Sequence, residues 1–105
     1  MAWEKKFFVD NARLYAPLLE SRESKREGEH IAMAIRRYLK GKGIDRGNIF
    51  DVPCGTGRVA IPLARYYKVT GIDISPYFIR IARKNARMKN VGKNAHFIVG
   101  DMKKL

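Results

Sequence analysis

The sequence predicts an α/β fold in which a small parallel sheet is flanked by helices. Short apolar runs that read as strands alternate with segments of helical periodicity, and the connections between them are short. A glycine-rich turn at 53–57 separates the first run from a helical segment. Each run also carries an aspartate at its carboxyl end. The three runs are 48–52, 68–73 and 95–99, and the aspartates are Asp51, Asp73 and Asp101. Sequential pairing with right-handed crossovers predicts the strand order 3-2-1.

The length and composition indicate one small domain in a reducing compartment. A chain of 105 residues with 46% hydrophobic residues can form a single core. No apolar run approaches the ~18–20 residues of a membrane span, and no signal peptide is evident after Met1. The single cysteine rules out an internal disulfide. We therefore expect a cytoplasmic protein that does not contact a membrane.

The first 43 residues are expected to form a helical cap on residues 44–105. Apolar residues between 3 and 20, with an aromatic cluster of Trp3, Phe7 and Phe8, roughly follow helical spacing. Pro17 predicts a break or a kink in that helix. The segment is expected either to cover the core or to close as a flap over a ligand. The polar residues 21–28 read as a loop.

The remaining elements follow from periodicity and capping signals. Residues 29–39 read as a helix that ends at Gly41 and Gly43. A helix is predicted at 57–66, although Pro62 requires either a place in its first turn or a later start. Ser75 and the proline after it predict a helix start, and this helix should reach about residue 89.

The carboxyl ends of the strands are the expected ligand site. In an open parallel sheet, ligands bind at these ends beside such turns. Gly55 and Gly57 allow close backbone approach, and the following helix offers unpaired N–H groups. Asp73, 22 residues after Asp51, suits a ribose hydroxyl. The candidate ligand contacts are Asp51, Pro53, Cys54, Gly55, Thr56, Gly57, Asp73, Ile74, Asp101 and Met102.

These residues resemble the class I S-adenosylmethionine-dependent methyltransferase family. Residues 51–57 are similar to its glycine motif, except that Pro53 replaces the first glycine and cannot donate an N–H. Asp73 matches the acid that holds the ribose hydroxyls in that family. Residues 100–102 match the end of the third strand, where the family contacts adenine. The resemblance implies a Rossmann-like fold with S-adenosylmethionine as cofactor, and it covers residues 48–102.

The resemblance also implies that this chain corresponds to the cofactor-binding half of the fold. The family has seven strands in the order 3-2-1-4-5-7-6, and the chain supplies three of them. We expect a fragment or truncated relative that is inactive alone, without a nameable catalytic residue, metal site or methyl acceptor. Cys54 has no histidine near it in sequence and is expected to be a small apolar residue of the turn.

Two other functions remain open from the residues alone. Residues 55–60 fit the pattern Gly-x-Gly-x-x-Ala of a nicotinamide dinucleotide-binding domain, and Asp73 would serve that ribose equally well. The net charge of +12 also allows a non-enzymatic nucleic-acid or partner-binding remnant. The charge is uneven, because residues 52–105 contain 11 basic and 2 acidic residues.

The first strand is expected to lie at an open edge. Ile49, Phe50 and Val52 would then expose unpaired backbone groups, and such edges recruit other strands. We expect the chain to self-associate or to bind a partner through this edge.

Overall fold

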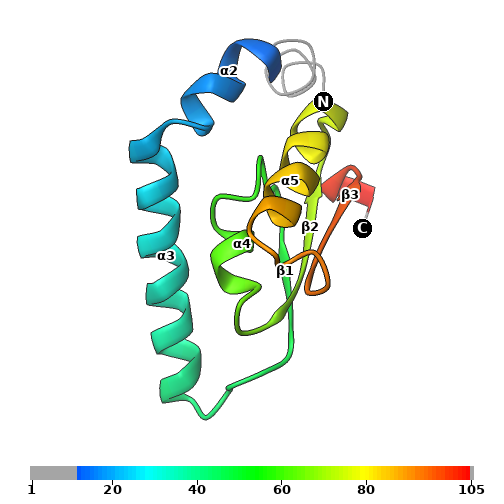
Figure 1. The fold of residues 1–105 in the computed structure, drawn as a ribbon. Helices are drawn as coiled ribbons and strands as arrows, with labels where there is room; N and C mark the ends of the chain where they lie inside the picture. Colours follow the sequence, from blue (N-terminus) through cyan, green and yellow to red (C-terminus); the bar gives the residue numbers. More distant parts are fainter. Residues whose placement is uncertain (1–11, 105) are drawn as a thin grey trace.

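The computed structural model describes residues 12–104 and shows a three-stranded sheet with helices packed against it. The N-terminal part is helical, and the strands alternate with helices thereafter (Figure 1). The elements are α2 (Ala12–Leu19), α3 (Arg22–Gly41), β1 (Asn48–Asp51), α4 (Ala60–Leu63), β2 (Lys68–Asp73), α5 (Pro76–Met88), β3 (Ala95–Val99) and the 3-10 helix η2 (Met102–Lys104). This arrangement confirms the predicted α/β class.

The sheet is parallel, with β2 between β1 and β3. Ile49 pairs with Val69, which pairs with Ala95 on the other side. This order is the predicted 3-2-1 arrangement, seen from the opposite edge. Because β2 is central, β1 lies at an edge of the described sheet.

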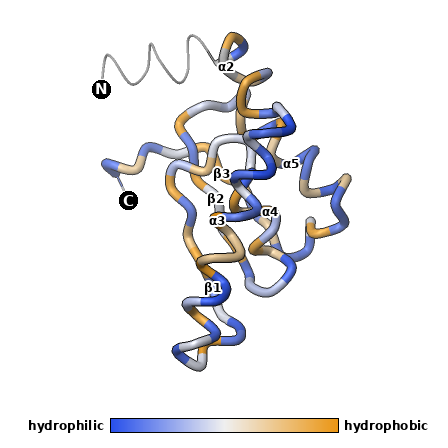
Figure 2. The backbone as a smooth tube through the Cα atoms, turned by 90° about the vertical axis from the view of Figure 1, so that its left-hand side faces the viewer, coloured by the Kyte–Doolittle hydropathy of each residue, from blue (hydrophilic) through white to orange (hydrophobic). Residues whose placement is uncertain are grey.

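One face of the sheet packs against the helices and forms the core. Val69 and Phe97 point to this side, where they meet Leu63 of α4 and Ile79 of α5. Helix α3 adds Ala32, which is fully buried in the same cluster. Along α3 and α5 apolar residues alternate with polar ones, as the hydropathy colouring shows (Figure 2). The three helices therefore share one core with the sheet.

Gly71 explains how tightly the middle of the sheet packs. A Cβ atom at this position would lie 2.6 Å from Cδ1 of Phe97 and 2.9 Å from Cβ of Cys54. Real Cβ atoms do not approach other atoms so closely. A glycine is therefore required if the turn after β1 is to lie directly against β2.

The opposite face of the sheet is exposed among the described residues. Phe50 on β1 is 69% exposed and Ile98 on β3 is 51% exposed, and His96 beside them is also exposed. Strand residues alternate between faces, so these side chains lie opposite Val69 and Phe97. Within residues 12–104, helices therefore cover one side of the sheet only.

The loop predicted at 21–28 was wrong, because these residues form the beginning of α3. Ser21 caps the helix by accepting a hydrogen bond from the Ser24 backbone N–H at 3.2 Å. Gly28 is inside the helix and buried, and a Cβ there would lie 2.4 Å from the Arg58 carbonyl oxygen. The glycine thus marks a close contact between α3 and the turn rather than a break in the helix.

The helix predicted at 57–66 is shorter than expected. The structure has α4 only over Ala60–Leu63, so Pro62 lies in its first turn, as the alternative of a later start required. Helix α5 and strands β2 and β3 confirm the predicted elements within one or two residues, and β1 ends at Asp51.

The prediction for residues 3–20 can be compared with the structure only in part. Helix α2 passes through Pro17 and ends at Leu19, two residues later. Trp3, Phe7 and Phe8 lie outside the described residues. Ala16 is buried against Phe78 of α5, so the described part of this segment packs against the helical side of the fold.

Candidate functional site at the carboxyl ends of the strands

The carboxyl ends of the three strands lie together at one rim of the sheet. Asp51 pairs in register with Gly71, two residues before Asp73. The backbone N–H of Gly100, just after β3, donates to the carbonyl oxygen of Asp73 at 2.9 Å. The aspartates predicted from sequence thus occur at neighbouring strand ends, as expected for a ligand site in a parallel sheet.

Asp73 is buried and fixes the glycine turn. Only 4% of the surface of Asp73 is exposed to solvent. One carboxylate oxygen accepts a hydrogen bond from the Gly55 N–H at 2.8 Å, and the other accepts one from the Ser75 N–H at 3.0 Å. Ser75 in turn caps α5 by accepting from the Phe78 N–H at 3.1 Å. A single carboxylate therefore joins the turn after β1 to the start of the helix after β2.

Asp51 lies at the same rim in a different environment. Burial raises the pKa of its carboxyl above the ordinary 3.8, the negative charge of Asp73 raises it further, and Arg58 lowers it. Its side chain makes no hydrogen bond to any residue between 12 and 104. Such a desolvated carboxylate would gain from a cationic ligand.

The two glycines of the turn face different surroundings. Both have positive φ angles, +56° at Gly55 and +90° at Gly57. A Cβ at Gly57 would lie 2.8 Å from Cδ1 of Ile61, inside the core side of the turn. A Cβ at Gly55 would meet only Cδ1 of Leu19, at 4.0 Å. Gly55 is therefore the glycine that leaves backbone open at the rim.

Pro53 and Cys54 form the base of the turn. The peptide bond between Val52 and Pro53 is cis. The Cys54 N–H donates to the Ile72 carbonyl at 3.0 Å, which attaches the turn to β2. Cys54 is buried, and burial, together with Asp73 and Asp51, raises the pKa of its thiol to about 12. The thiol therefore stays protonated at neutral pH and is unsuited to be a nucleophile.

Thr56 belongs to a polar cluster that the sequence did not reveal. Thr56 is 2% exposed to solvent, and its hydroxyl donates a hydrogen bond to Glu20 Oε2 at 3.2 Å. Asn85 of α5 donates to Glu20 Oε1 at 2.8 Å and to the Thr56 carbonyl at 3.3 Å. Lys25 lies 3.7 Å from Glu20 Oε2. Glu20 therefore ties the α2–α3 junction to the turn and to α5.

The other candidate residues lie around the rim with more exposure. Ile74 is half-buried between Asp73 and the start of α5. Asp101 accepts a hydrogen bond from the Lys103 N–H at 2.9 Å, and Met102 is 54% exposed. The structure thus brings Asp51, Asp73 and the turn together tightly, and places Asp101 and Met102 beyond the end of the neighbouring strand.

A hollow of about 290 Å³ lies on the helical side of the turn rather than at the strand ends. Thr56 and Gly57 line it together with residues of α3, α4 and α5.

Within the described residues, no three His, Cys, Asp or Glu side chains group as a metal site. None of the helices among residues 12–104 is long and apolar enough to cross a membrane.

Comparison with known proteins gives one consistent family. The sequence model of a protein family described as a methyltransferase domain matches residues 49–105 of this chain. An uncharacterized RNA methyltransferase of Parasynechococcus marenigrum is 38% identical over 80 residues, which are 75% of this chain and 17% of that protein. Yeast sterol 24-C-methyltransferase is 36% identical over 86 residues, covering 75% of this chain and 22% of its own length.

Solved structures agree with the sequence matches. The PH0226 protein of Pyrococcus horikoshii superimposes with a TM-score of 0.68 at 35% identity, over 83% of this chain and 36% of that one. The magnesium protoporphyrin IX methyltransferase of Synechocystis was solved with bound S-adenosylhomocysteine. It gives a TM-score of 0.66 at 27% identity, over 90% of this chain and 46% of that one. This chain spans less than half the length of each of these relatives. It belongs to the methyltransferase domain family, in the class I S-adenosylmethionine-dependent fold.

Proposed function

We propose that this chain holds S-adenosylmethionine at the rim formed by Asp51, Asp73 and the glycine turn, as the cofactor-binding part of a methyltransferase. The cofactor of the family supplies a methyl group activated on a positively charged sulfonium. Asp73 is proposed to accept the ribose hydroxyls, and Asp51 to face the cationic amino-acid end. The observation that carries the proposal is a buried carboxylate held by two backbone N–H groups beside a second carboxylate that has no hydrogen bond to residues 12–104.

The donor and acceptor groups at the rim fit this ligand. A carboxylate has about four lone-pair positions, and the two backbone N–H groups use two of those on Asp73. The remaining positions can accept from two hydroxyls. Asp51 has no hydrogen-bond donor among residues 12–104, so a cationic group would relieve the cost of its burial.

The open side of the turn supports close contact with a ligand. Gly55 has free space where a Cβ would point, so its backbone can be approached, and Thr56 can offer its backbone N–H while its side chain is held by Glu20. Pro53 contributes shape but no N–H. Ile74 and Met102 are proposed to contact the adenine apolarly, with Asp101 near its amino group.

The methyl acceptor and the parts of the protein that bind it are a separate proposal. Methyl transfer requires chiefly that donor and acceptor are held in line and that water is excluded. The described residues at the rim offer carboxylates that can orient the donor. We propose that acceptor contacts come from elsewhere, that the chain alone is inactive, and that it works in the cytoplasm.

Calorimetric titration tests the cofactor assignment directly. The chain should bind S-adenosylmethionine and S-adenosylhomocysteine, and it should bind NAD more weakly than either. Tighter binding of NAD would contradict the proposal. Incubation with labelled S-adenosylmethionine and cell fractions should give no label transfer by the chain alone; robust transfer would show that an acceptor site is assembled by these residues.

We also propose that the β1 edge and the exposed sheet face bind a second copy of the chain or a partner. Phe50 is 69% exposed on the edge strand, where backbone groups are open to pairing. Light scattering after size exclusion should show association that grows with concentration. Phe50→Lys should reduce it, whereas Leu18→Lys on α2, at 68% exposure, should not. A monomer at high concentration would refute the proposal.

A further inference from the structure

The outward face of α5 is basic and contains no acid. Arg80, Lys84 and Arg87 are spaced four and three residues apart, so they share one side of the helix. All three are exposed, and Lys89 follows directly at the helix end. No acidic residue occurs between Asp73 and Asp101. This concentration of positive charge therefore has no counter-charge on its own element.

The structure separates the cations of α5 that are engaged from those that are free. Arg83 donates two hydrogen bonds to the Phe97 carbonyl, at 3.2 and 2.7 Å, and therefore attaches α5 to β3. Arg80 lies over the Tyr77 ring at 5.7 Å. The side chains of Lys84, Arg87 and Lys89 have no hydrogen bond, ion pair or ring contact with any residue of the described part of the chain.

Helix α3 shows what a balanced face looks like in the same molecule. Its first part, residues 22–30, interleaves glutamates with basic residues, whereas residues 31–41 contain no acid. Across the hollow, Arg65 lies 3.7 Å from Glu29, Arg58 lies 3.9 Å from Glu27, and Lys25 lies 3.7 Å from Glu20. Cations on that side are thus offset by carboxylates, whereas those on α5 are not.

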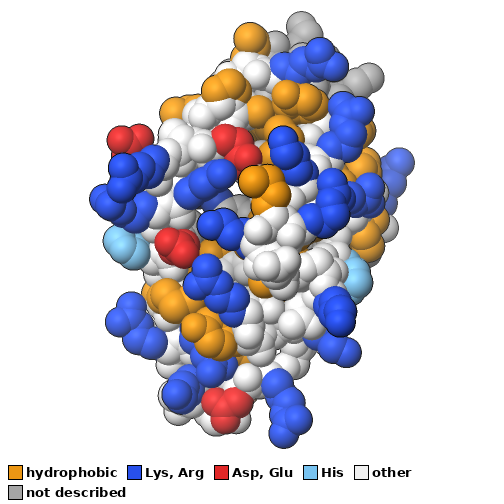
Figure 3. Space-filling model, in the orientation of Figure 1, with side chains coloured by type: hydrophobic (Ala, Val, Ile, Leu, Met, Phe, Trp, Pro, Cys, Tyr) orange, Lys and Arg blue, Asp and Glu red, His pale blue; other side chains and the backbone are white. Residues whose placement is uncertain are grey.

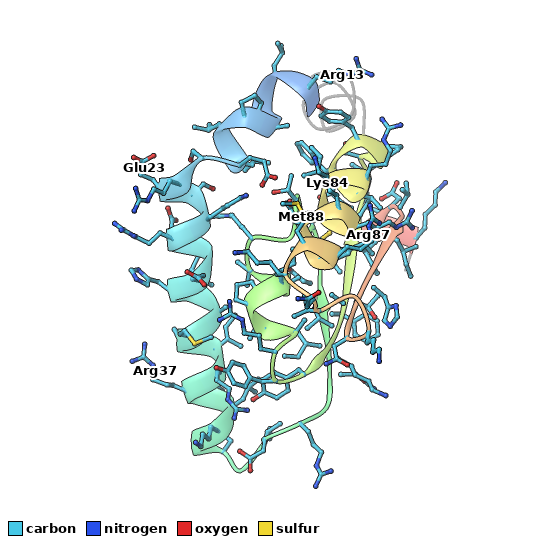
Figure 4. All side chains as sticks on the ribbon, in the orientation of Figure 1. Arg13, Glu23, Arg37, Lys84, Arg87 and Met88 are labelled. Carbon is cyan, nitrogen blue, oxygen red and sulfur yellow. The ribbon has the colours of Figure 1, made fainter. Side chains whose placement is uncertain are left out.

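One of these cations, Lys89, lines the hollow between α3 and α5, which also holds the carboxylates of Glu20 and Glu29. Met88 and Lys89 line it from α5, and its apolar lining includes Ile61 and Pro62 of α4. Met88 is 70% exposed at this border. Basic side chains and carboxylates lie around the hollow on the visible face (Figure 3), and Lys84, Arg87 and Met88 project from α5 (Figure 4).

We propose that this groove binds a single-stranded nucleic acid, with phosphates on Lys84, Arg87 and Lys89 and a base or sugar over Met88 in the hollow. Single strands bind along positively charged grooves that also offer surfaces for unstacked bases. A duplex would present phosphates but could not place a base in the hollow. This partner goes beyond the proposed cofactor site, which lies on a different side of the turn.

The test is fluorescence anisotropy with a labelled single-stranded RNA of about 12 nucleotides, within the range that one binding module covers. The double variant Lys84→Glu/Arg87→Glu should weaken binding at least about tenfold at moderate salt, since two phosphate contacts are lost. The slope of log affinity against log salt should fall by about 1.4, because each contact on a single strand contributes about 0.7.

The matched control is Arg37→Glu/Lys40→Glu, which changes the net charge equally on α3. Arg37 points away from the groove (Figure 4) and should leave affinity within about threefold. If both double variants lost the same amount of affinity for the RNA, affinity would follow net charge alone. That result would overturn the proposal that the groove binds the RNA. Tighter binding of the same sequence as a duplex, or no binding by the unmodified chain at about 50 mM salt, would also overturn it.

Two measurements keep the outcome interpretable. Lys84→Gln/Arg87→Gln removes the charges without reversal and should show the same direction of change with about half the loss in log affinity. S-adenosylhomocysteine binding, measured on each preparation, should be unchanged by all these variants. Normal cofactor binding without RNA binding would refute this groove and leave the cofactor site intact.

Discussion

Asp51 and Asp73 end neighbouring strands and lie at one rim, but their carboxylates are held differently. Asp73 is buried with a backbone N–H on each oxygen, from Gly55 and Ser75. Asp51 is partly buried with no hydrogen bond to residues 12–104, and its pKa is raised. One aspartate therefore builds the shape of the site, and the other keeps a charge available. Two residues with the same position in a sequence pattern can thus have different physical roles.

Removing the Asp73 carboxylate should produce the largest effect. Asp73→Ala breaks the links to Gly55 and Ser75 and removes the proposed ribose acceptor, so binding of S-adenosylhomocysteine should weaken by about 2–4 kcal/mol. The melting temperature should also fall, because the two N–H groups lose their partner. Calorimetry and thermal unfolding measure both.

The control for Asp73→Ala is Asp45→Ala, which removes an exposed carboxylate between α3 and β1. It should leave both quantities nearly unchanged. Equal affinity of Asp73→Ala and the unmodified chain would remove the ribose assignment. A lower melting temperature with unchanged affinity would leave Asp73 as a structural residue of the turn only.

Asp51→Asn should separate stability from binding. Since burial and Asp73 raise the pKa of Asp51, ionisation costs more in the folded state than in the unfolded state. The neutral variant should therefore melt at a higher temperature at pH 7 without ligand. It should also bind S-adenosylmethionine about tenfold more weakly, because a charge-assisted contact is lost.

The pH dependence gives an independent check on Asp51. Between its unfolded pKa, near 3.8, and its raised folded pKa, the folded state binds more protons, so this group lowers stability as the pH rises through that window. The stability gained by Asp51→Asn should thus be full once the pH lies above the raised folded pKa, and it should disappear as the pH falls towards 3.8. A gain that is independent of pH would show that charge is not its cause.

Glu20→Gln should have the smallest effect of the three. Glutamine keeps one acceptor oxygen, so one of the contacts to Thr56 and Asn85 can survive while the ion pair with Lys25 is lost. The affinity for S-adenosylhomocysteine should fall about two- to threefold, corresponding to one modest hydrogen bond. Glu23→Gln, exposed on the outer side of α3 (Figure 4), should have no effect. An equal change in both variants would exclude a role for the cluster.

The strands and the two aspartates could be predicted because their signals are local. Apolar runs that end in an acid, and Ser75 before a proline, show themselves within a few residues. The Glu20 cluster could not be predicted, because it joins residues 36 and 65 positions apart. Gly28 was misleading for the same reason: its requirement for a glycine comes from the Arg58 backbone, which only the folded chain brings near.

The one-sided cover of the sheet also has a calorimetric consequence. Globular proteins gain about 12–15 cal/mol/K per residue in heat capacity on unfolding, mainly because buried apolar surface becomes hydrated. Phe50 and Ile98 are already largely hydrated in the folded chain, so this gain should be smaller here. A smaller heat-capacity change flattens the dependence of stability on temperature. Any molecule that covers this face would therefore increase the free energy of unfolding and also make it depend more steeply on temperature.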